Sequence, residues 1–314
     1  MGLIDVHMHY MTPYYLKEME RAGRVNDHLM ALPKWGYDLM MQFMDEVGVT
    51  EGILSASSPN QSYGDKAAAL DLTRESNESG AGYCARLPGR LGLAIALPLP
   101  YVEETLAEIA YGYDVLKCCA VRVLSNSCGL YPGDPSTEPV FAELERRKAV
   151  VVLHPTPPPS IPENALSITP IPLYEFYNET ARAVITLILS GTVRRYPNIK
   201  YIVPHNGALL IPILERAGRL YNAHAKHPDT EPVDIIADAK TLYFDIAGDP
   251  FPRQLDTLLT VAAPARIVYG SDFPFCPVPG AAEILKQMQG RPATSKYNDM
   301  IFRSNALEIF PQFC

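Results

Sequence analysis

Short apolar runs rich in β-branched residues alternate along this chain with longer segments of helical composition. The apolar runs lie at 3–9, 51–56, 91–97, 120–124, 150–154, 200–205, 242–246 and 266–270. The helical segments lie at 37–47, 65–79, 102–111, 139–147, 173–190, 209–224, 252–260 and 281–289. This alternation is typical of repeated βα units that build a parallel sheet. The runs at 149–153 and 201–203 are apolar at nearly every position, as expected of strands buried on both faces.

Two architectures fit this alternation, a closed (β/α)8 barrel and an open doubly wound sheet. A nucleotide-binding open sheet would carry a GxGxxG or GxxxxGK[ST] loop, and the sequence contains neither. A chain of 314 residues with 47% hydrophobic content is enough for one barrel domain. We therefore expect an α/β fold, a TIM-type (β/α)8 barrel, with residues 1–314 as a single domain.

Charge and composition exclude several classes of partner. The formal net charge is −8 and the isoelectric point is near 5.4, which argues against a nucleic-acid-binding surface. No apolar run reaches the roughly 18 residues that a membrane-spanning helix needs, and the first strand-like run leaves no room for a cleavable signal. The six cysteines show no CxxC pair and no framework spacing. We expect a cytoplasmic protein that binds neither nucleic acid nor membranes.

Four of the seven histidines, His7, His9, His154 and His205, fall at the carboxyl ends of predicted strands. In a parallel barrel those ends share one face, where residues distant in sequence build the active site. His7 and His9 are two residues apart, so on a strand their side chains point to the same side. An isolated histidine is more often structural than a ligand. Adding His154 in LHPT and Asp272 in YGSDFP gives three imidazoles and a carboxylate, which suit one divalent ion, zinc or else manganese.

The motifs IDVHMH, LHPT, VPHNG and YGSDFPF occur in this order and resemble the amidohydrolase superfamily. Their spacing resembles one branch, the aminocarboxymuconate-semialdehyde decarboxylase-like family of metal-dependent non-oxidative decarboxylases, as far as the closing NALEIF segment. The resemblance implies that the metal ligands are His7, His9, His154 and Asp272. Its sixth-strand histidine falls on His205, for which it implies a catalytic role.

Many binuclear members of the superfamily carry a carboxylated lysine at the end of the fourth strand. This chain has Arg122 there, so the resemblance implies a single metal ion. Within the branch, the segment IDVHMHYMTPYY and the HNG turn resemble the fungal 6-methylsalicylate decarboxylases. The implied substrate is a small aromatic carboxylate of the salicylate type, which loses carbon dioxide after a proton is added to the ring carbon. Asp272 or a water on the metal could deliver that proton, and His205 could orient the donor or stabilise charge.

Further residues near the expected barrel mouth could bind the substrate. Tyr10, Trp35 and Phe275 could clamp a planar ring, although each could equally be ordinary packing. Family members are often dimers in which an arginine of the neighbour enters the site, and Arg219, with Arg216, is the matching candidate, although either could pair with local acids. We therefore expect a homodimer. Seven prolines between 155 and 172 could form a partial lid or a rigid surface loop.

Two other functions stay open. The same metal ligands could serve hydrolysis of an ester, lactone or amide, and carbon dioxide release without incorporation of water would separate the two reactions. A metal-stabilised barrel could also be a non-catalytic scaffold, in which case the metal site should be closed and hold no exchangeable water.

Overall fold

The computed structural model describes residues 2–24, 31–57, 65–161, 170–224 and 232–313. Within these ranges eight strands form one parallel sheet in which each strand pairs with the next along the chain. The strands are β1 (Leu3–Tyr10), β2 (Val49–Ala56), β3 (Leu91–Ala96), β4 (Ala120–Leu124), β5 (Val150–His154), β6 (Lys200–Val203), β7 (Tyr243–Asp245) and β8 (Ile267–Val268). Backbone hydrogen bonds from Val6 N to Tyr269 O (3.0 Å) and from His9 N to Phe273 O (2.7 Å) join β1 to the chain after β8. The sheet thus curves into the predicted TIM-type barrel.

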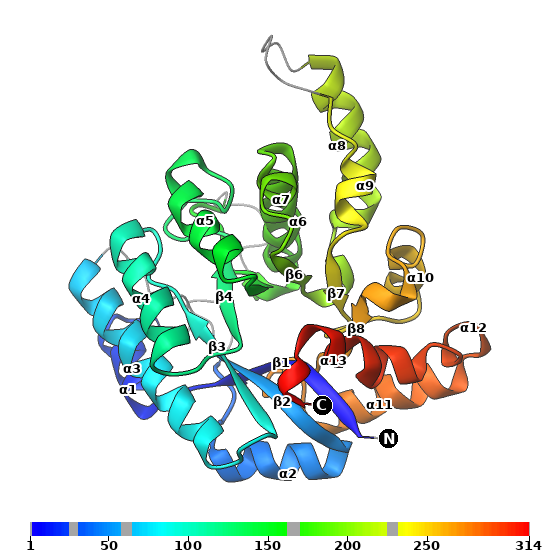
Figure 1. The fold of residues 1–314 in the computed structure, drawn as a ribbon. Coiled ribbons are helices and arrows are strands. Elements are labelled where there is room, and N and C mark those ends of the chain that lie inside the picture. Colours follow the sequence, from blue (N-terminus) through cyan, green and yellow to red (C-terminus); the bar gives the residue numbers. More distant parts are fainter. Residues whose placement is uncertain (1, 25–30, 58–64, 162–169, 225–231, 314) are drawn as a thin grey trace.

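Helices surround the strands (Figure 1). They are α1 (Pro13–Arg21), α2 (Tyr37–Val47), α3 (Lys66–Ala85), α4 (Val102–Asp114), α5 (Glu138–Arg146), α6 (Glu175–Leu189), α7 (Thr192–Arg195), α8 (Leu210–His224), α9 (Ile235–Ala239), α10 (Gln254–Leu258), α11 (Val278–Gly290), α12 (Pro292–Ser295) and α13 (Asn305–Ile309). Each predicted strand and helix corresponds to one of these elements. In the described ranges no helix is both long and apolar enough to span a bilayer.

The helices that were not predicted are α1 and the short α7, α9, α12 and α13. Helices of four or five residues complete only about one turn, so they show no apolar period that could reveal them. The start of α1 does carry a signal. Thr12 accepts a hydrogen bond from Tyr15 N at 2.9 Å, and Pro13 occupies the first helical position.

The barrel interior is filled from both ends of the chain. Apolar side chains of the strands, including Ile4, Val6 and Val152, pack there against Phe310 and Phe313 of the carboxyl-terminal segment. Figure 1 accordingly shows α13 beside the start of β1, with the two termini close together. Burying one such side chain fully stabilises the fold by about 1.5–3 kcal/mol. The amino-terminal end of the barrel is therefore closed by packed side chains, and the opposite end remains for chemistry.

Strand β1 contains a bulge in its middle. Asp5 pairs with Gly52 of β2. Met8 lies three residues after Asp5 but pairs with Leu54, which lies only two residues after Gly52. The extra residue interrupts the alternation of side chains along β1, as β-bulges do, often near active sites. Val6, on the amino-terminal side of Met8, packs in the barrel interior.

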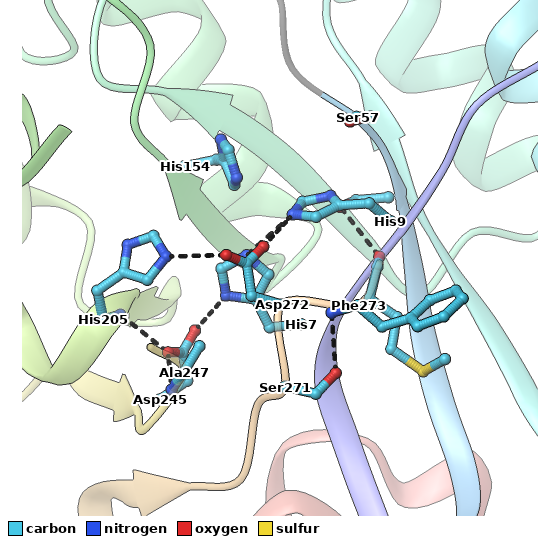
Figure 2. Close-up of polar contacts among 12 residues, drawn as sticks. His7, His9, Ser57, His154, His205, Asp245, Ala247, Ser271, Asp272 and Phe273 are labelled. Atoms are coloured by element: carbon cyan, nitrogen blue, oxygen red, sulfur yellow. Dashed lines mark hydrogen bonds and ion pairs between the residues drawn. The ribbon is translucent and has the colours of Figure 1, made fainter. Parts of the chain in front are cut away.

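Beyond the bulge, His7 and His9 face the carboxyl-terminal mouth of the barrel, as Figure 2 shows from the way their rings meet Asp272. Met8 and Tyr10 pack on the other side of the strand, in the apolar layer under the helices. A regular strand with Val6 inside would have turned both histidines toward the helices. The bulge is therefore what brings the HxH motif to the mouth.

Candidate metal centre and active site

Three imidazoles and one carboxylate converge at the carboxyl-terminal end of the barrel. His7 and His9 come from β1, His154 ends β5, and Asp272 follows β8, and one ligand atom of each lies within 4.8 Å of the others. The Nε2 atoms of His7 and His9 are 3.0 Å apart, and Oδ1 of Asp272 lies 3.5 and 3.2 Å from them. Figure 2 shows this arrangement. The structure thus brings together all four predicted ligands.

Each imidazole ring is held by a hydrogen bond at Nδ1, the nitrogen that faces away from the cluster. Nδ1 of His7 donates a hydrogen bond to Oδ2 of Asp245 at 2.8 Å, and Nδ1 of His154 donates to the carbonyl oxygen of Pro155 at 2.7 Å. Because a carbonyl oxygen can only accept, the proton of neutral His154 lies on Nδ1 and its Nε2 is free to bind a metal. Such outer partners are usual for histidines that bind metals.

His9 is held in the same way by Ser55, whose Oγ lies 3.0 Å from His9 Nδ1 and also donates to Met8 O at 3.4 Å. With the hydroxyl proton directed at Met8, Ser55 accepts the Nδ1 proton of His9 and leaves Nε2 without one. The Nε2 atoms of His7 and His9 face each other at 3.0 Å, and a divalent ion would take the place of the proton held between them. The donor set therefore fits one divalent ion.

Burial and neighbouring charges set the protonation of the three imidazoles. Burial lowers the pKa of His9 to about 4 and, with the neighbouring histidines, holds the pKa of His154 well below its usual range. Both rings are therefore neutral near pH 7, the form that binds a metal. Burial also acts to lower the pKa of His7, but the carboxylate of Asp245 outweighs it and raises that pKa to about 9.

Asp272 is ionised and is held in an unusual backbone conformation. Burial alone would raise its pKa, but hydrogen bonds from His205 and His9 hold that pKa well below the usual range. Its φ is 66°, in the left-handed region, which costs a non-glycine residue about 1 kcal/mol or more. Backbone hydrogen bonds from Asp272 N to His7 O (2.9 Å) and from Phe275 N to Asp272 O (2.8 Å) impose it. The carboxylate is thereby aimed at the cluster.

His205 lies beside the cluster in a tight turn after β6. His205 and Asn206 both have a φ of 57°, and Pro204, which has no N–H, precedes them. Strand β6 therefore ends at Val203 rather than at the predicted residue 205. Nε2 of His205 is 3.6 Å from Oδ2 of Asp272, and its Nδ1 is buried without a hydrogen-bond partner among the described residues. The His205 ring also lies 5.3 Å from the His7 ring and 6.4 Å from the His154 ring between centroids, so Asp272 is its polar contact with the cluster.

Asp245 was not predicted as a site residue. It ends β7 and is fully buried, and its Oδ1 accepts the N–H groups of His205 (2.9 Å) and Ala247 (3.0 Å) while its Oδ2 holds His7. An acidic residue at the carboxyl end of a predicted strand was the available signal, the same one that identified Asp272.

Asp5 and Ser55 were also not predicted. Oδ1 of Asp5 accepts the backbone N–H groups of His7 and Ser271, each at 3.0 Å, and burial raises the pKa of Asp5 to about 7. These contacts join β1 to the segment that carries Asp272. Neither residue has a spacing that distinguishes it within its strand, so the sequence holds no comparable signal.

A cavity of about 450 Å³ opens above the cluster. His154, His205 and Asp272 contribute polar groups to it, and its other walls are Pro170, Pro172, Leu173, Phe176, Tyr177, Gly248, Asp249 and Phe275. The volume is within the usual range for small-molecule sites, and no lysine or arginine lines the cavity among the described residues. The ring of Phe275 also meets the His9 ring edge-to-face, with centroids 5.9 Å apart. Phe275 therefore lies in the cavity wall beside the cluster.

Tyr10 and Trp35 are not brought to this cavity. Tyr10 is 1% exposed, and its hydroxyl donates to Ser76 O at 2.8 Å in the layer under α3. Trp35 packs against Tyr10 and Tyr83, with ring centroids 6.4 and 4.9 Å apart. The expectation that they clamp the substrate is corrected, because Tyr10 directly follows His9 on β1 and alternation along the strand turns it to the helix side. Both are packing residues in this structure.

Arg219 is likewise remote from the cavity of its own chain. It is exposed on α8 and lines a separate hollow of about 440 Å³ together with residues of α9. Of the proline-rich segment, Pro170 and Pro172 line the cavity above the cluster. The predicted lid spans residues 155–172, and of these, residues 162–169 lie outside the described residues.

Comparisons with known proteins agree on one family. Residues 4–312 match the model of the amidohydrolase family. A 6-methylsalicylic acid decarboxylase of Aspergillus aculeatus is 30% identical over 98% of this chain and 96% of its own length. A crystal structure described as an amidohydrolase II is 32% identical, with a TM-score of 0.91 over 99% of this chain and all of its own. A dihydroxybenzoic acid decarboxylase of a Polaromonas species, solved with manganese, shares the fold at 23% identity, with a TM-score of 0.81 over 99% of this chain and 97% of its own.

Proposed function

The chain belongs to the amidohydrolase family, and we propose that it is a metal-dependent, non-oxidative decarboxylase of salicylate-type acids whose substrate is 6-methylsalicylate. One observation carries the proposal. The four-ligand cluster and His205 lie at one side of a cavity of about 450 Å³ whose remaining walls are mostly apolar and aromatic. Such a cavity suits a planar ring with its polar substituents directed at the cluster. The similarity to the decarboxylase of Aspergillus aculeatus supports the choice of substrate.

His7, His9, His154 and Asp272 are the residues that would hold the ion. Their nitrogen-rich donor set suits zinc, with manganese as the second candidate. The ion would supply positive charge that orients the substrate carboxylate and the adjacent hydroxyl and neutralises their charge. The hydrogen bonds of Asp245 to His7 and of Ser55 to His9 would keep these rings directed at the ion.

The reaction needs a proton at the ring carbon that bears the carboxylate. When the new C–H bond forms, that carbon becomes tetrahedral and the ring loses its aromaticity. The C–C bond to the carboxylate then breaks, its electron pair returns to the ring, and carbon dioxide leaves. His205 and Asp272 are the proton-handling groups of the cavity in this proposal, because Nε2 of His205 faces Oδ2 of Asp272 at 3.6 Å. Because Asp272 is ionised in the resting state, His205 is the group that would deliver the proton in this proposal.

The apolar walls have a separate role. Phe275, Phe176 and Leu173 would hold the ring in position and keep water away from the reacting carbon. We also propose that the protein is a homodimer. The cavity has no lysine or arginine of its own among the described lining residues, and the exposed Arg219 of α8 is available to a neighbouring chain.

The proposal is tested by incubating the metal-loaded protein, with zinc and with manganese, with a panel of hydroxybenzoates and with aryl esters and lactones. We expect carbon dioxide from 6-methylsalicylate with the highest kcat/KM of the panel, and no hydrolysis of the esters or lactones. Hydrolysis without any carbon dioxide release from the panel would show instead that the site is a hydrolase.

A further inference from the structure

We propose that this chain has a second ligand site, for a phosphate-bearing anion, at the amino-terminal end of the barrel. A cavity of about 650 Å³ lies there, and its walls come from the segments that lead into β5, β6, β7 and β8. Lys148 precedes β5, Lys200 begins β6, Thr241 precedes β7 and Arg266 precedes β8. The metal cluster is at the carboxyl-terminal ends of the strands. The cavity is therefore at the opposite end of the barrel and takes no part in the proposed reaction.

The charge of this cavity is positive, although the chain as a whole carries −8. Its lining includes four basic residues and one acidic residue, namely Lys148, Arg194, Lys200, Arg266 and Asp238. Arg194 forms an ion pair with Asp238. That pair leaves three cations in the cavity for which no carboxylate partner exists among the described residues.

The partners of these three cations do not neutralise their positive charge. Lys200 Nζ donates to the backbone carbonyl of Glu308 at 2.7 Å, which is a neutral partner. The guanidinium of Arg266 lies 4.5 Å from the ring centroid of Tyr243. Lys148 is exposed on the turn after α5. Several cations gathered around one hollow repel each other, and a bound anion would relieve that repulsion.

A buried hydroxyl independently indicates a ligand. Tyr201 lines the same cavity and is only 2% exposed, and its hydroxyl has no hydrogen-bond partner among the described residues. Buried hydroxyl groups in proteins are nearly always bonded, and leaving one unbonded costs about 1–3 kcal/mol. An oxygen of a bound anion would accept this hydrogen bond.

The combination selects a phosphate group over a simple carboxylate. Guanidinium groups bind phosphate through paired hydrogen bonds, and lysines add point charges for a dianion. One phosphate would fill only part of about 650 Å³, and Val193, Pro197 and Ile199 provide apolar wall beside the cations. The ligand class is therefore a small organic phosphate, with inorganic phosphate as its minimal form.

The test is calorimetric titration of the metal-loaded protein with inorganic phosphate and with AMP at constant ionic strength. We expect one saturable site per chain, with AMP binding more tightly than phosphate. A Lys200→Met/Arg266→Met double variant should bind at least about tenfold more weakly, because it loses two charged contacts. No saturable binding of either probe, or unchanged binding by the double variant, would overturn the proposal.

Three further variants keep the test decisive if the double variant does not fold. Lys148 and Lys117 both have a positive φ (51° and 57°) at exposed turns before strands, and only Lys148 lines the cavity. Lys148→Asn should weaken binding, whereas the matched Lys117→Asn should not, and equal affinities would count against the site. A His7→Ala variant without bound metal should bind both probes like the unmodified protein. Loss of binding in that variant alone would assign the anion to the metal centre and refute the second site.

Discussion

Oδ2 of Asp272 lies 3.6 Å from Nε2 of His205, while Oδ1 of the same carboxylate faces His7 and His9, two of the proposed metal ligands. Asp272 therefore touches both the proposed metal and the proposed proton donor, whereas the polar contact of His205 with the cluster is the one to Asp272. This difference separates the two residues experimentally. A change at Asp272 should affect metal content and chemistry together, and a change at His205 should affect chemistry alone.

Replacing His205 with Ala or Asn should keep the metal and lower kcat on the order of 10²-fold or more, the usual size for loss of one proton-handling or charge-stabilising group. Metal stoichiometry and turnover should be measured on the same preparation. His224→Ala, at an exposed histidine on α8, is the matched control and should be unchanged. Near-normal turnover would remove His205 from the mechanism, and a parallel loss of metal would make it a ligand.

Replacing His7, His9 or Asp272 with Ala should abolish tight metal binding while leaving the barrel largely folded, since apolar layers rather than the ligands set the core. Metal analysis and circular dichroism on each purified variant provide the measurement. If all three variants retain a full complement of metal, the proposed ligand set is incorrect.

Asp245 should make metal binding depend on pH in a defined direction. Burial acts to lower the pKa of His7, but Asp245 raises it to about 9, so below that pH the metal-free protein holds a proton that the ion must displace. Metal affinity should therefore rise about tenfold per pH unit up to about pH 9 and level off above it. In Asp245→Asn the levelling should move to lower pH, and affinity at high pH should fall about 10–100-fold. Chelator competition across pH measures both, and an affinity independent of pH would contradict the assignment.

Phe275→Ala should change KM and Tyr10→Phe should change stability, each without the other effect. Phe275 lines the cavity, so its loss should raise KM for the aromatic substrate with little change in Tm. Tyr10→Phe removes a buried hydrogen bond to Ser76, so it should lower stability by about 1 kcal/mol without changing KM. Thermal unfolding and steady-state kinetics on both variants decide this. A raised KM in Tyr10→Phe with unchanged Tm would return Tyr10 to the substrate site.

The fold and the four-residue cluster were predictable because both depend on repeated or short-range features. Helix α2 was predicted with both ends correct, and the HxH pair, His154 and Asp272 stand at strand ends, where a barrel must bring them together. Tyr10 was placed wrongly because adjacent side chains alternate along a strand, so the residue after His9 faces the helices rather than the mouth. Asp5 and Ser55 were missed because their roles arise only from contacts between strands.

The most direct test of the proposed decarboxylation is to incubate the metal-loaded protein with 6-methylsalicylate in deuterium oxide and to analyse the gas and the phenolic product. Protonation of the ring carbon by a solvent-exchanged group predicts equimolar carbon dioxide and 3-methylphenol carrying one deuterium on the carbon that bore the carboxylate. The His205→Ala variant should form the same product far more slowly. Recovery of unchanged 6-methylsalicylate from the metal-loaded protein, with neither carbon dioxide nor 3-methylphenol formed, would contradict the proposed function.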